Sequence, residues 1–220
     1  MSGGGKKGRS GGPKMGATRK GVTRKGAAKT APVKSAAGAG PRKLAVRLKT
    51  AKGRTTSSQL WLSRQLNDPY VAQARQDGYR SRAVYKLLQI HERYKILKSG
   101  QRVIDLGAAP GGWSQAAARL VRAGESGGGQ VIAIDISAME PIADVTVLEL
   151  DFMDDAAPGR LKGLLEGHKA DVVLSDMAAP ATGHRATDHL RIMALAEIAA
   201  DFACEVLAPG GAFLCKVLQG

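Results

Sequence analysis

One carboxylate followed by a run of small residues is the feature of this sequence most suited to chemistry. Asp105 ends an apolar stretch, and residues 106–113 are Leu-Gly-Ala-Ala-Pro-Gly-Gly-Trp. Glycines such as Gly107 allow unusual backbone angles and let a ligand approach the main chain closely. We therefore predict a strand, a turn and a helix that bind a nucleoside cofactor, with Asp105 and Gly107 among its contacts.

The order of these residues narrows the class of cofactor. The glycines do not follow the Gly-x-Gly-x-x-Gly spacing of nicotinamide-binding proteins, and the carboxylate precedes them. A carboxylate in this position suits a cationic amino-acid group better than a pyrophosphate, which is bound by the N-terminus of a helix. A purely structural turn is the alternative interpretation.

Three further aspartates stand where predicted strands end: Asp135, Asp151 and Asp176. The carboxyl ends of parallel strands meet at one edge of a sheet, so we expect these side chains near the glycine turn. Asp135 is placed to accept hydrogen bonds from ribose hydroxyls, and Asp151 to accept one from an adenine amino group. Each aspartate alone could equally close a turn or cap a helix.

Lys216 interrupts a predicted apolar strand. Lysine is seldom buried without a partner, and Asp176, at the end of the neighbouring strand, is the partner that we expect. Burial favours the neutral amine of a lysine, which can then accept a proton near neutral pH while a carboxylate orients it. A structural ion pair and an edge lysine that protects the sheet are the alternatives.

Alternating strands and helices are needed to bring these residues together. Apolar runs predict strands at residues 102–106, 130–136, 145–149, 171–175 and 211–217, and helical patterns lie near 114–122, 158–167 and 188–207. This alternation predicts an α/β fold with a doubly wound, mostly parallel sheet and a ligand at the carboxyl ends of its strands.

Residues 57–96 precede this pattern and are predicted to be helical and basic. We interpret this basic segment either as a surface that contacts nucleic acid or as a merely solvated face. Its basic residues include Arg64, Arg75, Arg80, Arg82, Lys86, Arg93 and Lys95.

Positive charge is concentrated near the N-terminus. The 220 residues carry a net charge of +14. Residues 1–56 contain 16 Lys or Arg and no Asp or Glu. Residues 57–220 contain 17 basic and 19 acidic residues, so their net charge is −2. Because residues 1–56 also lack aromatic side chains, we predict a disordered basic tail before one globular domain at 57–220. Such a tail suits the phosphates of RNA or DNA, and less well anionic lipid; a transit peptide is a further alternative.

The remaining sequence signals bear on location. Cys204 and Cys215 are the only cysteines, and neither lies in a metal-ligand pattern. We expect both to be core residues of a protein in a reducing compartment, the cytoplasm. We expect no membrane partner, because no apolar run reaches transmembrane length.

Four segments together closely resemble the FtsJ-like (RlmE) ribosomal RNA large-subunit 2′-O-methyltransferases. They are residues 105–115 (DLGAAPGGWSQ), 175–178 (SDMA), 207–211 (LAPGG) and 216–220 (KVLQG). The resemblance extends over residues 57–220 and leaves the basic tail outside.

This resemblance implies a Rossmann-like fold that uses S-adenosylmethionine. The cofactor contacts that it implies are Gly111, Trp113, Asp135, Asp151 and Asp176. It also implies a lysine, an aspartate and a second lysine around the target ribose, and the matching positions are Lys86, Asp176 and Lys216. The substrate of the family is a uridine in the large ribosomal RNA, methylated on the assembled ribosomal subunit, and we expect a monomeric enzyme.

The sequence departs from the family pattern at two places. A proline in the loop after residue 176, Pro180, lies one position later than expected. Family members also continue for some tens of residues beyond the segment that matches 216–220, adding a helix, two strands and a glutamate of the active site, so we expect a truncated C-terminal end.

We expect methylation of a uridine 2′-hydroxyl with Lys216 as general base; a non-catalytic RNA-binding or ribosome-assembly factor that retains the cofactor pocket is the alternative.

Overall fold

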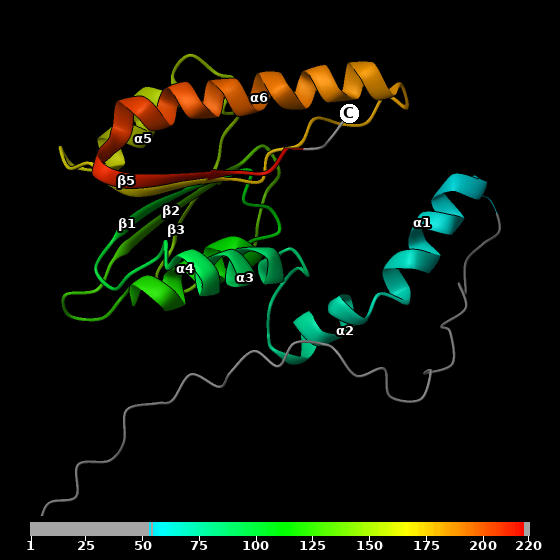
Figure 1. The fold of residues 1–220 in the computed structure, drawn as a ribbon, viewed down its shortest axis with the longest axis horizontal. Helices are drawn as coiled ribbons and strands as arrows, with labels where there is room; N and C mark the ends of the chain where they lie inside the picture. The colour runs from blue at the N-terminus through cyan, green and yellow to red at the C-terminus, as the bar shows by residue number, and fades with distance from the viewer. Residues whose placement is uncertain (1–52, 54, 218–220) are drawn as a thin grey trace, which may run out of the picture. The chain divides into compact units, whose positions relative to one another are not determined.

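In the computed structural model, which describes Gly53 and residues 55–217, the apolar runs form one sheet of five parallel strands (Figure 1). The strands are β1 (Arg102–Leu106), β2 (Gln130–Asp135), β3 (Thr146–Glu149), β4 (Ala170–Ser175) and β5 (Leu207–Cys215). Their order, β3-β2-β1-β4-β5, changes direction between β1 and β4. The predicted doubly wound parallel sheet is therefore confirmed, with its switch point beside the glycine turn.

Helices cover both faces of this sheet. In the described part of the chain, α1 (Thr56–Leu66) and α2 (Pro69–Gln76) precede the sheet, and the helices that lie on it are α3 (Val84–Tyr94), α4 (Gly112–Val121), α5 (Ala157–Leu164) and α6 (Arg185–Val206). Figure 1 shows α5 and α6 on one face and α3 and α4 on the other. Among the described residues, no helix has the length and apolar character needed to cross a membrane.

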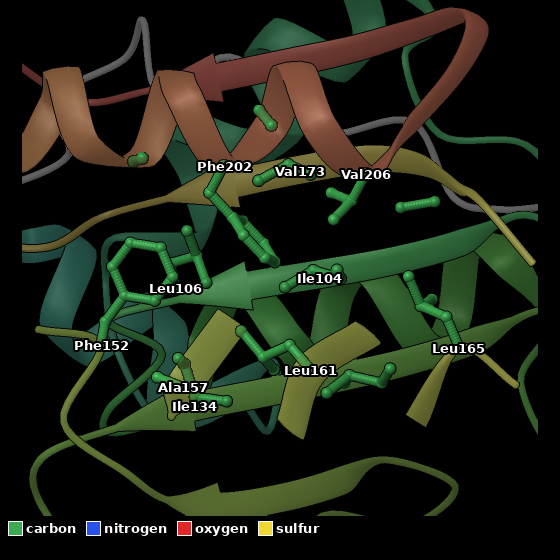
Figure 2. Close-up of a cluster of buried hydrophobic side chains, with 14 of the residues drawn as sticks. Ile104, Leu106, Ile134, Phe152, Ala157, Leu161, Leu165, Val173, Phe202 and Val206 are labelled. Atoms are coloured by element: carbon green, nitrogen blue, oxygen red, sulfur yellow. The ribbon is translucent and has the colours of Figure 1, made fainter. Parts of the chain in front are cut away.

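Two hydrophobic cores result, one on each face of the sheet. On the α5 and α6 side, Ile104 and Leu106 of β1 are buried with Phe152 and Phe202, whose rings meet edge to face at 5.3 Å (Figure 2). Successive residues of a strand point to opposite faces, so Val103 joins the core under α3 and α4 instead. The same alternation points Asp105 toward α4, which begins immediately after the glycine turn.

The basic tail falls almost entirely outside the described residues, and its predicted disorder stays a prediction. The first helix, α1, starts at Thr56, and the Thr55 hydroxyl accepts a hydrogen bond from Ser58 N as its cap; the predicted domain boundary at residue 57 stays a prediction.

Two local predictions were wrong. The last strand begins at Leu207, directly after α6, and not at residue 211. Pro209 and Gly210, which has a φ of +80°, are residues typical of turns, but a shift in the pairing of β4 with β5 between Ala170 and Val172 accommodates them within the strand. Cys204 is exposed and is not a core residue, because its neighbours on α6 occupy the face that packs on the sheet.

Candidate active site

The carboxyl ends of β1, β2, β4 and β5 lie side by side at one edge of the sheet. Asp176 N donates a hydrogen bond to Leu106 O at 3.0 Å, and Lys216 N donates one to Ser175 O at 2.9 Å. On the other side of β1, Gly107 N donates to Ile134 O at 2.9 Å. The edge therefore brings together residues that are far apart in the sequence, as the parallel topology predicts.

Gly107 is required by the close contact between the first turn and the segment after β4. Its φ is +74°, and a Cβ atom at this position would lie 2.7 Å from Met177 Cα. Such a contact involves backbone atoms and cannot be relieved by a side-chain rotation. The absence of a side chain at Gly107 thus allows the first turn to pack directly on the segment after β4.

Gly111 has a different role in the turn. It is the N-cap residue of α4 with a φ of +107°, and an added Cβ atom would lie 2.6 Å from Ile142 Cδ1 and 3.4 Å from Arg80 Nη1. Its missing side chain therefore allows the turn to pack on Arg80 and Ile142. A direct cofactor contact by Gly111 stays a prediction.

Asp105 is a fully buried carboxyl group at the end of β1. Burial is the main reason that the pKa of Asp105 is raised to about 7, and the carboxylates of Asp176 and Asp135 raise it as well. A hydrogen bond that Ser114 Oγ donates to Asp105 Oδ2 at 2.5 Å acts in the opposite direction and lowers the pKa. The second oxygen of Asp105, Oδ1, is buried without a hydrogen-bond partner in the described structure. An unpaired buried acceptor is costly, so this oxygen is well suited to receive a hydrogen bond from a ligand.

Two cavities meet at Gly107. One, of about 430 Å³, is lined by Asp105, Gly107, Trp113 and Asp176. The other, of about 310 Å³, is lined by Gly107, Asp135, Asp151, Phe152, Met177 and Leu195. The first cavity contains carboxyl groups, which suit a cationic group of a ligand. The second contains carboxylates together with aromatic and aliphatic side chains, which suit a flat base. Together the two cavities fit a ligand that has both parts.

Asp135 and Asp151 are both held by backbone groups. Asp135 Oδ2 accepts a hydrogen bond from Ala109 N at 2.9 Å, and Asp135 Oδ1 accepts one from Ser137 N at 2.8 Å. Asp151 Oδ1 accepts one from Met153 N at 2.9 Å. Each carboxylate oxygen has a second lone pair, so the turn contacts leave room for hydrogen bonds to a ligand.

Trp113 links the glycine turn to the helix that carries Lys86. The ring lines the first cavity, is 4% exposed, and its Nε1 donates a hydrogen bond to Ala83 O at 2.8 Å. Ala83 is the N-cap residue of α3. The ring therefore holds the start of α3 beside the cofactor turn.

Lys216 and Asp176 form the predicted pair, although β5 ends one residue before Lys216. Their side chains form an ion pair, 23% and 22% exposed respectively, and Lys216 Nζ also donates to the backbone oxygen of Asp176 at 3.1 Å. A third cavity, of about 570 Å³, is lined by Lys86, Asp176 and Lys216 together. The three residues expected around a ribose thus share one cavity, and Asp176 also lines the first one.

Sequence reasoning missed two side chains that build this site. Ser114 supplies the hydrogen bond to Asp105, and no spacing rule marks a lone helical serine as its partner. Arg80, predicted only as part of a basic face, donates to the backbone oxygens of Glu140 at 2.5 Å and Pro141 at 2.7 Å. Arg80 thereby holds the loop after β2 against the start of α3.

Other residues of the predicted basic face are engaged within the protein. Arg82 forms an ion pair with Asp68, and the Arg93 guanidinium lies 5.2 Å from the ring centre of Tyr94. Among residues 55–217, no group of three or more His, Cys, Asp or Glu side chains is placed to hold a metal ion.

A doubly wound parallel sheet with a glycine turn after β1 and acidic groups at the neighbouring strand ends defines a Rossmann-like methyltransferase fold. The family model of the FtsJ-like methyltransferases matches residues 79–220. The chain belongs to the FtsJ-like methyltransferase family.

Individual relatives agree with this assignment. The chain is 59% identical over 188 residues to Ribosomal RNA large subunit methyltransferase E of Rhodospirillum rubrum, covering 86% of this chain and 71% of that protein. It is 57% identical over 179 residues to the protein of the same name from Azorhizobium caulinodans, covering 81% and 74%. Among solved structures, a Plasmodium falciparum protein described as a ribosomal RNA methyltransferase superposes with a TM-score of 0.59 at 30% identity, covering 64% of this chain and 80% of that one.

Proposed function

We propose that this protein transfers a methyl group from S-adenosylmethionine to the 2′-hydroxyl of a uridine in large-subunit ribosomal RNA. The observation that carries the proposal is the cavity shared by Lys86, Asp176 and Lys216, which adjoins the glycine-turn cavity through Asp176. The names of the relatives support ribosomal RNA as the substrate.

The cavities on either side of Gly107 would hold the cofactor. When bound, S-adenosylmethionine supplies a methyl group that is electrophilic because it is attached to a sulfonium. Asp105 Oδ1 is the acceptor for the ammonium of the methionine part, Asp135 for the ribose hydroxyls, and Asp151 for the adenine amino group. Phe152 and Leu195 offer apolar surface to the base. Gly107, Gly111, Trp113 and Asp176 complete the proposed cofactor contacts.

The lysines and the aspartate of the third cavity supply the remaining chemistry. Lys216 Nζ, in its neutral form, would accept the proton of the ribose 2′-hydroxyl as the hydroxyl oxygen forms its bond to the methyl group; the bond between that methyl group and sulfur would break, and its electron pair would stay on sulfur. Asp176 holds Lys216 through their ion pair, and the Lys86 ammonium aligns the hydroxyl. A ribose hydroxyl is a weak nucleophile, so both proton removal and alignment favour the reaction.

Binding of the RNA would rest on the basic tail and the basic face. Arg64, Arg75 and Lys86 are exposed, and residues 1–56 carry 16 Lys or Arg. Phosphate contacts by such residues give an affinity that depends strongly on salt. We propose one catalytic domain at residues 57–220 that acts as a monomer in the cytoplasm, with 1–56 as a basic arm.

Methyl transfer to undermethylated large ribosomal subunits tests the function most directly. Incubation with labelled S-adenosylmethionine, followed by mapping of the modified nucleotide, should show one ribose methylation, and free ribosomal RNA run in parallel identifies the preferred substrate. A protein that binds both S-adenosylmethionine and RNA but transfers no methyl group would instead be an assembly factor. Binding of NAD in place of S-adenosylmethionine would indicate an oxidoreductase.

A further inference from the structure

The cavity that contains Lys86, Asp176 and Lys216 has a second wall, which the proposed methyl transfer does not use. This wall is formed by helices α2 and α3 and the segment between them, through Tyr70, Arg82, Tyr85 and Gln89. The cavity volume of about 570 Å³ is space that the lining side chains leave free, and a ribose hydroxyl alone does not fill it. The wall is therefore available to a further part of the same substrate.

Tyr70 presents a flat aromatic surface on this wall. The residue is 41% exposed, whereas its neighbour Tyr85 is only 7% exposed. The two ring centres lie 5.6 Å apart, with the ring planes inclined at 47°. Tyr70 thus has one side against the protein and another open to the cavity.

The surroundings of Tyr70 are fixed before any ligand arrives. Tyr85 donates a hydrogen bond from its hydroxyl to Asp77 Oδ2 at 2.7 Å, and burial together with this bond raises the Tyr85 pKa well above its usual range, so the phenol stays protonated. Tyr70 N donates to Asp68 Oδ1 at 2.8 Å, and Asp68 is in turn paired with Arg82. These contacts hold the backbone of Tyr70 and the neighbouring Tyr85 ring in place, which lowers the conformational entropy lost when a partner binds.

We propose that this wall is a nucleobase-binding subsite, in which the Tyr70 ring stacks on the base of the nucleotide to be methylated. A ribose that faces Lys216 brings its base close to this wall, because the base and the ribose are joined by a single bond. In proteins that recognise unpaired nucleotides, the bases of these nucleotides stack on aromatic side chains. Gln89, three residues after Lys86 on α3, adds an amide that can both donate to and accept from the edge of a base. The inference rests on the proposed function.

Substitution of Tyr70 separates stacking from packing. Tyr70→Phe keeps the ring, and we expect its kcat/KM on undermethylated large subunits to stay within about threefold of wild type. Tyr70→Leu keeps an apolar side chain without a ring, and we expect a loss of about 5- to 150-fold, the range found when a stacking side chain is removed. Affinity for S-adenosylmethionine should be unchanged in both variants.

Tyr94 provides a matched control, because it is 61% exposed, lies at the end of α3 and does not line the cavity. We expect Tyr94→Leu to retain wild-type kcat/KM. An inactive wild-type protein would refute the proposed function itself. An active wild type together with a Tyr70→Leu variant as active as Tyr94→Leu would overturn the subsite alone.

A binding measurement decides the question if Tyr70→Leu fails to fold, as judged by its thermal unfolding. Wild-type protein should bind hexauridylate at least fivefold more tightly than a six-nucleotide RNA of abasic ribose phosphates, which has the same backbone charge. Equal affinity for the two oligomers would overturn the nucleobase subsite, and Tyr70→Phe should show the wild-type preference.

Discussion

Lys216 is joined to Asp176 by two interactions, a side-chain ion pair and a hydrogen bond from Lys216 Nζ to the backbone oxygen of Asp176 at 3.1 Å. The backbone bond directs the amine toward the end of β4, and the carboxylate compensates its charge when it holds a proton. Both side chains line the cavity that also contains Lys86. A proton acceptor is therefore held in place at the junction of the two proposed binding sites.

Replacing Lys216 by Ala should remove methyl transfer and preserve cofactor binding. General-base catalysis contributes about 100- to 10,000-fold to a rate, so we expect a loss of that size in single-turnover transfer to large subunits. Calorimetry should give a dissociation constant for S-adenosylmethionine close to wild type. If cofactor binding were lost as well, Lys216 would be a structural residue.

Asp135→Ala should weaken cofactor binding. The substitution removes the proposed ribose contact and also leaves the backbone N–H groups of Ala109 and Ser137 without their acceptor. Hydrogen bonds to a charged group contribute about 1.5 to 3 kcal/mol, so we expect the dissociation constant to rise roughly 10- to 150-fold. Asp135→Asn, which retains one acceptor oxygen, should show a smaller effect. An unchanged dissociation constant would exclude a ribose contact.

Cofactor affinity should increase as the pH rises from 6 to 7. With a pKa of about 7, Asp105 is mostly protonated at pH 6 and about half ionised at pH 7, and only the carboxylate attracts an ammonium group. The ionised fraction rises about fivefold over this interval, and the dissociation constant should fall by the same factor. Asp105→Asn should bind with little pH dependence in this range; a wild-type affinity that is equally flat would contradict the proposed contact.

The same carboxyl group should make the folded protein less stable at higher pH. Because the pKa is raised above the unfolded value of 3.8, the folded state holds more protons than the unfolded state between about pH 4 and pH 7. The free energy of unfolding should therefore fall as the pH rises through this window. Urea titrations at pH 5 and pH 8 should show a smaller difference for Asp105→Asn than for wild type.

Gly107→Ala should destabilise the protein and weaken cofactor binding. The new Cβ atom would meet Met177 Cα at 2.7 Å, and the φ of +74° is unfavourable for alanine. Strain of this kind costs on the order of 1 to 3 kcal/mol, which urea titration can detect.

Gly163→Ala is the matched control for this change. Gly163 lies within α5, and nothing would lie within 4 Å of an added Cβ atom. Alanine is the better helix former, so we expect a gain in stability of about 0.5 to 1 kcal/mol. A Gly107→Ala variant that is as stable as Gly163→Ala would refute the packing argument.

Removing residues 1–52 should weaken RNA binding and reduce its dependence on salt. This deletion retains Thr55, whose hydroxyl caps α1, so the domain should keep its stability. Each phosphate contact that is lost should reduce the slope of log affinity against log salt by roughly 0.7 to 0.9. Filter binding at several salt concentrations measures this slope, and an unaltered slope would show that the tail does not contact RNA.

Much of the site could be predicted because its positions follow from local patterns and one topological rule. The apolar runs determine the strands, and the carboxyl ends of parallel strands must meet at one edge. Asp135, Asp151 and Asp176 were located in this way. The pairing of Lys216 with Asp176 followed as well, because a lysine beside a buried strand needs an opposite charge nearby.

The sequence by itself therefore determined the parallel α/β fold, the glycine turn after β1 and the carboxylates at the strand ends. Only the tertiary structure decided that Ser114 bonds Asp105, that Arg80 holds the loop after β2, and that Tyr70 faces the cavity. It also decided that Cys204 is exposed. These features depend on how helices dock on the sheet, and docking brings together side chains that no periodicity or spacing along the chain relates.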